Sequence, residues 1–313
     1  MKTVLITGGA GFLGRQIARE FLATGARVIC IDAVLPENAP AGVSLTYHQL
    51  QLPNPVLMEV LRKEAPEICI HCAGRASVPF SMSDPAADFR DNTTLTFEVL
   101  EALRRAAPAC GFLLLSSAAV YGNPPMLPVR EDERCAPLSP YGFHKWMCEL
   151  LCQEFAKVHG MRTAVVRIFS AYGAGLRRQV IWDICAKALG SGGVALRGTG
   201  EESRDFIHAV DIARALVLLA EKAEWDGAIY NLASGAETTI AALAARLVEL
   251  LECPTVPQFD GKRFAGEPVR WQADVAKIRA LGFAPSMTLD RGLATVATWA
   301  RAELRGDLPT LRH

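Results

Sequence analysis

The segment Thr7-Gly8-Gly9-Ala10-Gly11-Phe12-Leu13-Gly14 constrains the fold more than any other part of the chain. It joins an apolar run over residues 2–7, which predicts a buried strand, to a helical pattern over residues 12–24. The glycines at 8, 11 and 14 allow a tight turn, a close approach of the backbone to a phosphate and close packing of helix on strand. The first turn of such a helix offers free N–H groups and a positive dipole end. We therefore predict a dinucleotide-binding turn.

Strand-length and helix-length segments alternate through the first half of the chain. We predict strands over residues 2–7, 27–32, 67–72, 111–117 and 162–168. We predict helices over residues 12–24, 55–64, 85–106, 138–159 and 177–189. Units of this kind connect by right-handed crossovers into a parallel sheet that is covered on both faces. The prediction is an α/β fold with a doubly wound parallel sheet.

The alternation weakens after about residue 170, where glycine-rich stretches punctuate shorter strands. A helix over 209–222 and a strand over 228–232 are predicted to rejoin the main sheet. We therefore expect a dinucleotide-binding domain over residues 1–170, to which 207–234 return. The remaining parts, 171–206 and 235–313, are expected to form a smaller, interleaved substrate-binding region.

Charge and cysteine content exclude several classes of function. The 33 basic and 33 acidic residues give no net charge, which argues against nucleic acid or an anionic membrane as a partner. Since the chain starts with a strand pattern and has nine cysteines, an odd number, we expect a cytoplasmic protein with reduced thiols. Cys69 and Cys72 lie in a strand pattern, where residues three apart face opposite sides. We read them as buried thiols and predict no metal site.

Asp32 indicates which dinucleotide is bound. It ends the second predicted strand, 18 residues after Gly14, where a carboxylate can bond the hydroxyls of the adenosine ribose. A carboxylate there repels a 2′-phosphate, and no arginine follows within several residues. We therefore predict NAD, while Arg15 leaves NADP open and a turn-forming aspartate is the alternative interpretation.

Tyr141 and Lys145 are four residues apart, so a helix places both on one face. An ammonium beside a phenol favours the phenolate and lowers its pKa, which allows proton exchange with a hydroxyl group near neutral pH. Ser117 ends the apolar run over 111–117, and its hydroxyl can complete a proton relay. The three residues predict acid–base chemistry on an alcohol or sugar hydroxyl.

Taken together, these residues resemble the extended short-chain dehydrogenase/reductase family, specifically its NAD-dependent nucleotide-sugar epimerases and dehydratases. The resemblance covers essentially the whole chain and implies a Rossmann-type sheet. It includes several further segments: Ile70-His-Cys-Ala-Gly74, Asn92, Tyr121-Gly122, Arg167 to Gly173, and Arg204-Asp-Phe-Ile-His208 leading to Asp211.

The resemblance implies roles for individual residues. Tyr141 would take the proton of a sugar hydroxyl, most often at C4, Ser117 would orient that oxygen, and Lys145 would keep Tyr141 anionic. The cofactor would be bound by Gly8, Gly11, Phe12, Leu13, Gly14, Asp32, Ala73, Gly74, Asn92, Tyr141 and Lys145. The substrate would be bound by Ser117, Ser170, Arg204, Arg263 and Glu267. A homodimer with a four-helix interface, formed by the helices at 85–106 and 138–159, is also implied.

Residues 118 and 119 discriminate between the reactions of the family. In its 4,6-dehydratases, Asp and Glu occupy these positions and move the protons of dehydration, but here both residues are alanine. The motif is similar to that of the 4-epimerases, and we predict an epimerase acting at C4 through a transient 4-keto-sugar. A nucleotide-sugar 4-dehydrogenase or 4-ketoreductase with exchangeable cofactor is the main alternative. A dehydratase or a non-catalytic NAD-sensing protein is less favoured.

Several positions depart from the family pattern and leave the substrate open. Ser170 stands where asparagine is common, and Gln179-Val-Ile-Trp182 replaces a run that helps to hold uridine. The sugar and the nucleobase therefore stay unassigned. His144 replaces the usual Ser or Thr before the lysine, and either tunes Lys145 or faces the interior of the fold.

Overall fold

The computed structural model describes residues 2–36, 42, 44–262, 266 and 268–305. Its main element is a seven-stranded parallel sheet with the order β10-β6-β5-β4-β1-β2-β3. The bounds of these strands are β1 Thr3–Thr7, β2 Arg27–Asp32, β3 Leu45–Gln49, β4 Ile68–His71, β5 Gly111–Ser117, β6 Thr163–Ile168 and β10 Asp226–Leu232. The predicted doubly wound parallel sheet is confirmed. β3, an edge strand with mixed burial, was not predicted.

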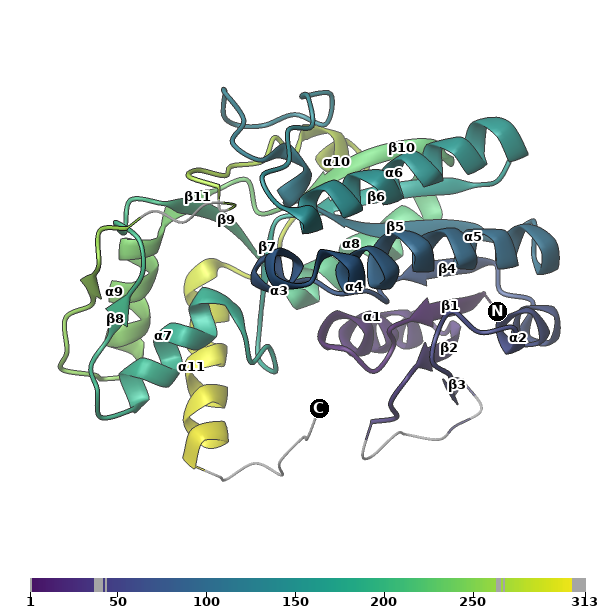
Figure 1. Ribbon diagram of the computed structural model, residues 1–313. Helices are drawn as coiled ribbons and strands as arrows, with labels where there is room; N and C mark the ends of the chain where they lie inside the picture. Colours follow the sequence, from purple (N-terminus) through teal and green to yellow (C-terminus); the bar gives the residue numbers. More distant parts are fainter. Residues whose placement is uncertain (1, 37–41, 43, 263–265, 267, 306–313) are drawn as a thin grey trace.

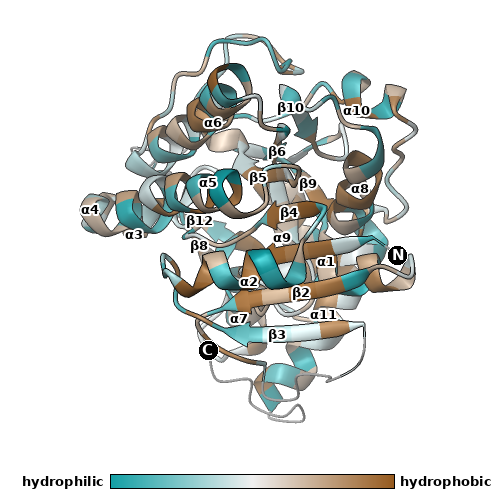
Figure 2. Ribbon diagram, turned by 90° about the vertical axis from the view of Figure 1, so that its right-hand side faces the viewer, coloured by the Kyte–Doolittle hydropathy of each residue, from teal (hydrophilic) through white to brown (hydrophobic). Residues whose placement is uncertain are grey.

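Helices cover both faces of this sheet (Figure 1). α1 and α8 bury their apolar sides on one face, and α2, α5 and α6 bury theirs on the other. The bounds are α1 Phe12–Ala23, α2 Val56–Glu64, α3 Val78–Ser83, α4 Pro85–Phe89, η1 Arg90–Thr94, α5 Leu95–Ala106, η2 Ala118–Tyr121, α6 Pro140–His159 and α8 Ala209–Lys222. Strands such as β1 and β2 consist mostly of hydrophobic residues (Figure 2), and these are buried on both sides because helices cover both faces of the sheet.

The long helix predicted over residues 85–106 is divided into three consecutive pieces. α4 and α5 are joined by η1, a π-helical segment that contains Asn92. π-Helical turns inside α-helices are frequent at functional sites. The chain therefore stays helical from Pro85 to Ala106, but with a local change of pitch at Asn92.

A second lobe lies beside the carboxyl edge of the sheet (Figure 1). It has its own apolar core, to which α7, α9 and α11 contribute. Its sheets have the orders β11-β9-β7 and β12-β8. The bounds of its elements are β7 Ser170–Tyr172, α7 Gln179–Leu189, β8 Ala195–Leu196, β9 Ser203–His208, β11 Glu237–Thr239, α9 Ile240–Leu250, β12 Gln258–Phe259 and α11 Leu289–Arg305. α10 Ala276–Ala280 packs instead against β10 of the large sheet.

The strand order reverses its direction of growth between β1 and β4. At such a point the loops after the two strands diverge to opposite faces and leave a crevice, in which open α/β sheets bind ligands. The glycine turn follows β1 and Gly74 follows β4, so both border this crevice. Among the residues that the structure describes, none of the helices has the length and apolar character of a membrane span.

Candidate active site

The glycine turn is fixed by backbone contacts at the end of β2. The N–H of Gly8 donates to the carbonyl of Ile31 at 2.8 Å. A Cβ atom on Gly14 would lie 2.1 Å from the carbonyl oxygen of Gly8, so only glycine lets α1 pack this closely. Gly11 caps α1 without a side-chain hydrogen bond, which leaves the N–H groups of Phe12 and Leu13 for a ligand. This cradle fits the pyrophosphate of NAD.

Asp32 lies at the last position of β2. Its Oδ2 accepts a hydrogen bond from the N–H of Ala10 at 2.9 Å, which ties the carboxylate to the glycine turn. Its Oδ1 accepts a longer bond of 3.4 Å from the N–H of Val34. The carboxylate therefore borders the turn at an orientation set by the backbone, and the sequence Ala33-Val34-Leu35 after it brings no cation.

The loop after β4 forms the opposite wall of the crevice. The N–H of Ala73 donates to Oγ1 of Thr7 at 3.3 Å, which holds the loop against β1. Gly74 has a φ of +133°, and a Cβ atom there would lie 2.8 Å from Oδ1 of Asn92. The position therefore needs glycine for both its backbone and its space. Asn92 approaches this wall from η1, and its role in cofactor binding stays a prediction.

The proposed catalytic residues are brought together by the start of α6 and the end of β5. Ser139 caps α6, its Oγ accepting from the N–H of Gly142 at 3.3 Å, and Pro140 follows, which fixes Tyr141 in the first turn. A Cβ on Gly142 would lie 2.7 Å from the carbonyl oxygen of Ala119, so α6 touches η2 directly after Ser117. The hydroxyl of Tyr141 has no hydrogen-bond partner within the described chain, although the residue is only 8% exposed.

Lys145 is buried, with 7% of its surface exposed, and its ammonium donates to the carbonyl of Leu115 at 3.0 Å. This contact ties α6 to β5 two residues before Ser117. Oγ of Ser117 accepts from the N–H of Ala119 at 3.2 Å, so the serine also caps η2. Ser117, Tyr141 and Lys145 thus come from adjoining segments at the carboxyl edge of the sheet. Their roles stay predictions.

His71, beside this site, is a structural residue. It is fully buried, with Nδ1 2.7 Å from Oγ1 of Thr7 and Nε2 3.3 Å from Oγ1 of Thr96. Burial, with a smaller contribution from the charge of Lys145, lowers the pKa of His71 to about 3. The imidazole is therefore neutral at physiological pH, as expected for a core histidine.

Two of the predicted substrate residues, Ser170 and Arg204, lie on neighbouring strands of the second lobe. Ser170 on β7 pairs in register with Phe206 on β9, and Arg204 precedes Phe206 by two residues. The guanidinium of Arg204 lies 5.4 Å from the ring centre of Trp271 and donates to the carbonyl of Ser203 at 2.8 Å. Arg263 and Glu267, also predicted to bind substrate, lie outside the described residues.

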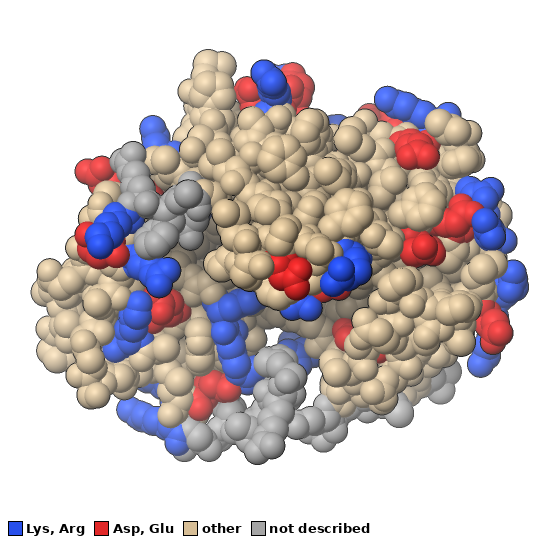
Figure 3. Space-filling model, in the orientation of Figure 1, with Lys and Arg blue, Asp and Glu red and all other residues tan. Residues whose placement is uncertain are grey.

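The sequence did not indicate a second arginine, which lies where the second lobe meets the loop after β4. Arg178, just before α7, donates through Nη1 to the carbonyl of Ala76 at 2.8 Å. This contact joins the second lobe to the loop that carries Gly74. No motif marks Arg178 in the sequence, because it is a single arginine at a helix start. Figure 3 shows a hollow between the two parts, with basic side chains at its edge.

The cysteines take no part in this site. All nine are free thiols, and burial raises the pKa of Cys69 and Cys72 well above the ordinary range. Nowhere in the described ranges do three or more His, Cys, Asp or Glu side chains gather in a way that could hold a metal ion.

Comparisons with known proteins agree with this geometry. A sequence model of the NAD dependent epimerase/dehydratase family matches residues 4–233. The UDP-glucose 4-epimerase of Azospirillum brasilense is 29% identical, over 96% of this chain and 92% of its own. The GDP-6-deoxy-D-mannose reductase of Pseudomonas aeruginosa is 27% identical, over 95% of this chain and 96% of its own. The structure of MoeE5 in complex with UDP-glucuronic acid and NAD matches with a TM-score of 0.88 at 28% identity, over 96% of this chain and 99% of that one.

Proposed function

The chain belongs to the NAD-dependent epimerase/dehydratase family, and we propose that it is a nucleotide-sugar epimerase that acts at C4. The assignment to this family, predicted from the sequence, is confirmed. The observation that carries the proposal is the arrangement of Ser117, Tyr141 and Lys145 beside a cradle that fits NAD. Similarity to a UDP-glucose 4-epimerase over nearly the whole chain supports the same reaction and makes UDP-sugars the first substrates to test.

The residues of the chain divide the reaction between them. The phenolate of Tyr141 takes the proton from the sugar hydroxyl, and the positive charge of Lys145 stabilises that phenolate before the transfer. The hydroxyl of Ser117 orients the reacting oxygen. Bound NAD would supply the hydride chemistry, and C4 is inverted only if the hydride returns to the opposite face of the keto-sugar. For the reverse transfer, Tyr141 gives its proton back to the oxygen of the keto-sugar, so the cycle is balanced in protons and electrons.

Ala118 and Ala119 support an epimerase over a dehydratase. Both side chains are buried in the turn that follows Ser117, and a methyl group cannot move a proton. Loss of water from C5 and C6 needs an acid and a base near those carbons. Residues 118 and 119, which supply this acid and base in dehydratases, are alanines here and cannot supply them.

The second lobe is proposed to bind the nucleotide diphosphate. Arg204 brings a guanidinium to the boundary, and such a group matches the oxygen atoms of a diphosphate in charge and geometry. Ser170, on the adjacent strand, would contribute a hydroxyl. Arg263 and Glu267 stay predictions from the sequence.

A second candidate function uses the same residues. A 4-dehydrogenase or 4-ketoreductase would need the same catalytic residues but would exchange its cofactor in each turnover. The similarity to a reductase that acts on a GDP-sugar supports keeping this candidate.

One experiment separates the two candidates. The purified protein is incubated without added cofactor with UDP-, GDP-, CDP- and dTDP-sugars, and the products are followed by NMR. Interconversion of C4 epimers supports the epimerase and identifies the nucleotide. Reaction only after NAD or NADH is added, with a stoichiometric change in absorbance at 340 nm, assigns a dehydrogenase or reductase instead.

The outer faces of α5 and α6 are proposed to form a homodimer. Large apolar side chains are exposed there at helical spacing: Phe97, Phe143, Met147, Leu150 and Val158. A pair of helices from each of two copies can cover these side chains in a four-helix arrangement. We expect the wild type to sediment as a dimer and the Leu150→Lys variant to sediment as a monomer. A wild type that sediments as a monomer would contradict the dimer.

We also propose a reducing, cytoplasmic location, because all nine cysteines are free and most are buried. Fractionation of the source cells with an antibody against the chain tests this location.

A further inference from the structure

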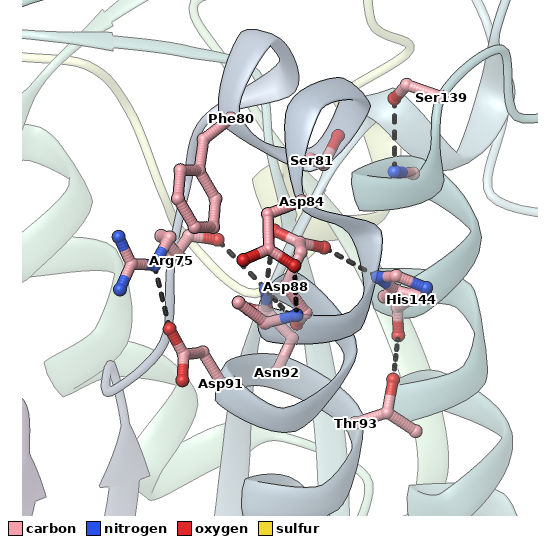
Figure 4. A network of polar contacts seen from close by, with 12 residues as sticks. Arg75, Phe80, Ser81, Asp84, Asp88, Asp91, Asn92, Thr93, Ser139 and His144 are labelled. Atoms are coloured by element: carbon pink, nitrogen blue, oxygen red, sulfur yellow. Dashed lines mark hydrogen bonds and ion pairs between the residues drawn. The ribbon is translucent and has the colours of Figure 1, made fainter.

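A buried polar network connects α4, η1 and α6 beneath the crevice (Figure 4). At its centre is Asp88, which is 0% exposed. Nδ1 of His144 lies 2.6 Å from Oδ2 of Asp88, and Nδ2 of Asn92 donates to Oδ1 at 3.2 Å. Each oxygen of the Asp88 carboxyl group thus has a side-chain partner, His144 for Oδ2 and Asn92 for Oδ1. His144 therefore faces the interior of the fold, one of the two alternatives that the sequence left open.

The network fixes the orientation of the Asn92 side chain. Besides bonding the carboxylate of Asp88, Nδ2 of Asn92 donates to the backbone carbonyls of Arg75 and Asp88, each at 3.1 Å. The reversed amide would turn its oxygen toward these three acceptors, which is unfavourable. The amide oxygen consequently points away from them. It faces Gly74, where a Cβ atom would lie only 2.8 Å away.

This oxygen is an acceptor in need of a donor. Asn92 is 1% exposed, and its Oδ1 has no hydrogen-bond partner within the part of the chain that the structure describes. Buried side-chain oxygens are seldom left unpaired in proteins, so such an atom at a binding crevice points to a ligand. The partner must be a hydroxyl or an N–H group, because phosphate oxygens of an ionised pyrophosphate cannot donate.

We propose that Asp88 and His144 are positioning residues that hold the Asn92 amide with its oxygen toward Gly74, where it accepts a hydrogen bond from a ribose hydroxyl or the carboxamide of bound NAD. The inference rests on the proposed cofactor. Asp88 acts through Asn92, and His144 acts through Asp88. The hydroxyl of Thr93 also donates to the carbonyl of His144 at 3.3 Å, so η1, as well as α4, is tied to α6.

A double-mutant cycle on NAD affinity tests this chain of contacts. The dissociation constant of NAD is measured by calorimetry on nucleotide-free wild type, Asp88→Ala, Asn92→Ala and the double variant. Because one hydrogen bond is at stake, each single variant is expected to bind NAD about tenfold more weakly. The double variant is expected to show the same loss of about tenfold, since without Asn92 the carboxylate has nothing to orient.

Two further variants distinguish positioning from general support of the fold. Asp88→Asn keeps an oxygen that accepts from Asn92. Nδ1 of His144, in the tautomer with its proton on Nε2, can accept from the new amide. We therefore expect an affinity for NAD close to that of the wild type. Asp84→Ala serves as the control, because Asp84 caps α4 but does not contact Asn92. It should lower the melting temperature without changing NAD affinity.

The outcomes distinguish a failure of the positioning role from a failure of the proposed cofactor. Additive losses in the double variant, or unchanged affinity in Asp88→Ala, would overturn the positioning role while leaving NAD as cofactor. Failure of the wild type to bind NAD would overturn both. Should Asp88→Ala not fold, His144→Ala replaces it in the cycle, with a smaller loss that should likewise vanish in the Asn92→Ala background.

Discussion

The carboxyl edge of the large sheet and the second lobe hold their functional groups in different ways. At the sheet edge, Lys145 is buried against the carbonyl of Leu115, and Gly14 is packed against the glycine turn. In the second lobe, Arg204 is half-buried beside Trp271, and Arg178 reaches a single carbonyl across the boundary. The first region is fixed by backbone geometry, and the second depends on long side chains.

This difference predicts which property each region controls. A buried group with backbone partners, such as Lys145, has few alternative positions. A half-buried arginine such as Arg204 can be replaced or redirected at a modest cost in stability. Substitutions at the sheet edge should therefore affect turnover and cofactor binding, and substitutions in the second lobe should affect substrate binding.

The largest effect is expected for Tyr141→Phe. Without the phenol, no group takes the proton of the sugar hydroxyl, and turnover should fall by about 10²–10⁴-fold, the usual contribution of general acid–base catalysis. NAD binding should stay near that of the wild type, which calorimetry can check. Tyr230→Phe is the control, because its hydroxyl accepts a backbone N–H in the core and should not affect turnover. Retained turnover in Tyr141→Phe would remove this residue from its proposed role.

Arg204→Ala tests the other side of the comparison. A diphosphate that loses its charged hydrogen bonds should bind about 10- to 100-fold more weakly, while the affinity for NAD should not change. Arg246→Ala, which breaks exposed ion pairs with Glu249 and Asp290 in the same lobe, should change neither affinity. A loss of NAD affinity in Arg204→Ala would show that the two regions are not separable in this way.

A pair of glycine variants compares the packing of the two regions. Gly14→Ala forces a methyl group against the carbonyl of Gly8 and should destabilise the protein by about 1–3 kcal/mol. Gly192→Ala in the second lobe has no neighbour within 4 Å and should change stability very little. Chemical denaturation measures both. Equal stability of the two variants would contradict the close packing of α1 on the turn.

The smallest effect is expected for Asp32→Ala. Removing the carboxylate should weaken NAD through the loss of its bonds to ribose hydroxyls, by about tenfold. The affinity for NADP should rise relative to that for NAD, because the repulsion of a 2′-phosphate disappears. Titration with both nucleotides gives the ratio. Unchanged NAD affinity would show that Asp32 serves only the turn.

The sequence predicted the fold well where the apolar pattern was strong. The central strands were found to within one or two residues because they are buried on both faces. β3 was missed because its residues, such as Thr46 and His48, are only half-buried at the edge of the sheet. The division near Asn92 could not be predicted either, since a π-helical turn has no distinctive spacing of apolar residues.

The parts of the site that a sequence motif determines could be predicted. The parts that depend on tertiary contacts could not. The glycines of the turn, where a Cβ atom would meet the backbone, were visible in the sequence as a Gly-x-x-Gly-x-x-Gly spacing. The pair of Asp88 and His144 joins residues 56 positions apart and depends on how α4 meets α6. One signal for Asp88 did exist, because it precedes Asn92 by one helical turn. No comparable signal exists for Arg178.

The fate of the hydrogen at C4 tests the central claim most directly. A UDP-sugar carrying deuterium at C4 is incubated with the purified protein and no added cofactor, and the product is analysed by NMR. A self-contained epimerase takes the deuteride and returns it within one active site, so the C4 epimer should keep its label. Formation of the epimer with loss of the label, or no reaction with any of the nucleotide-sugars until nucleotide is added, would contradict the account.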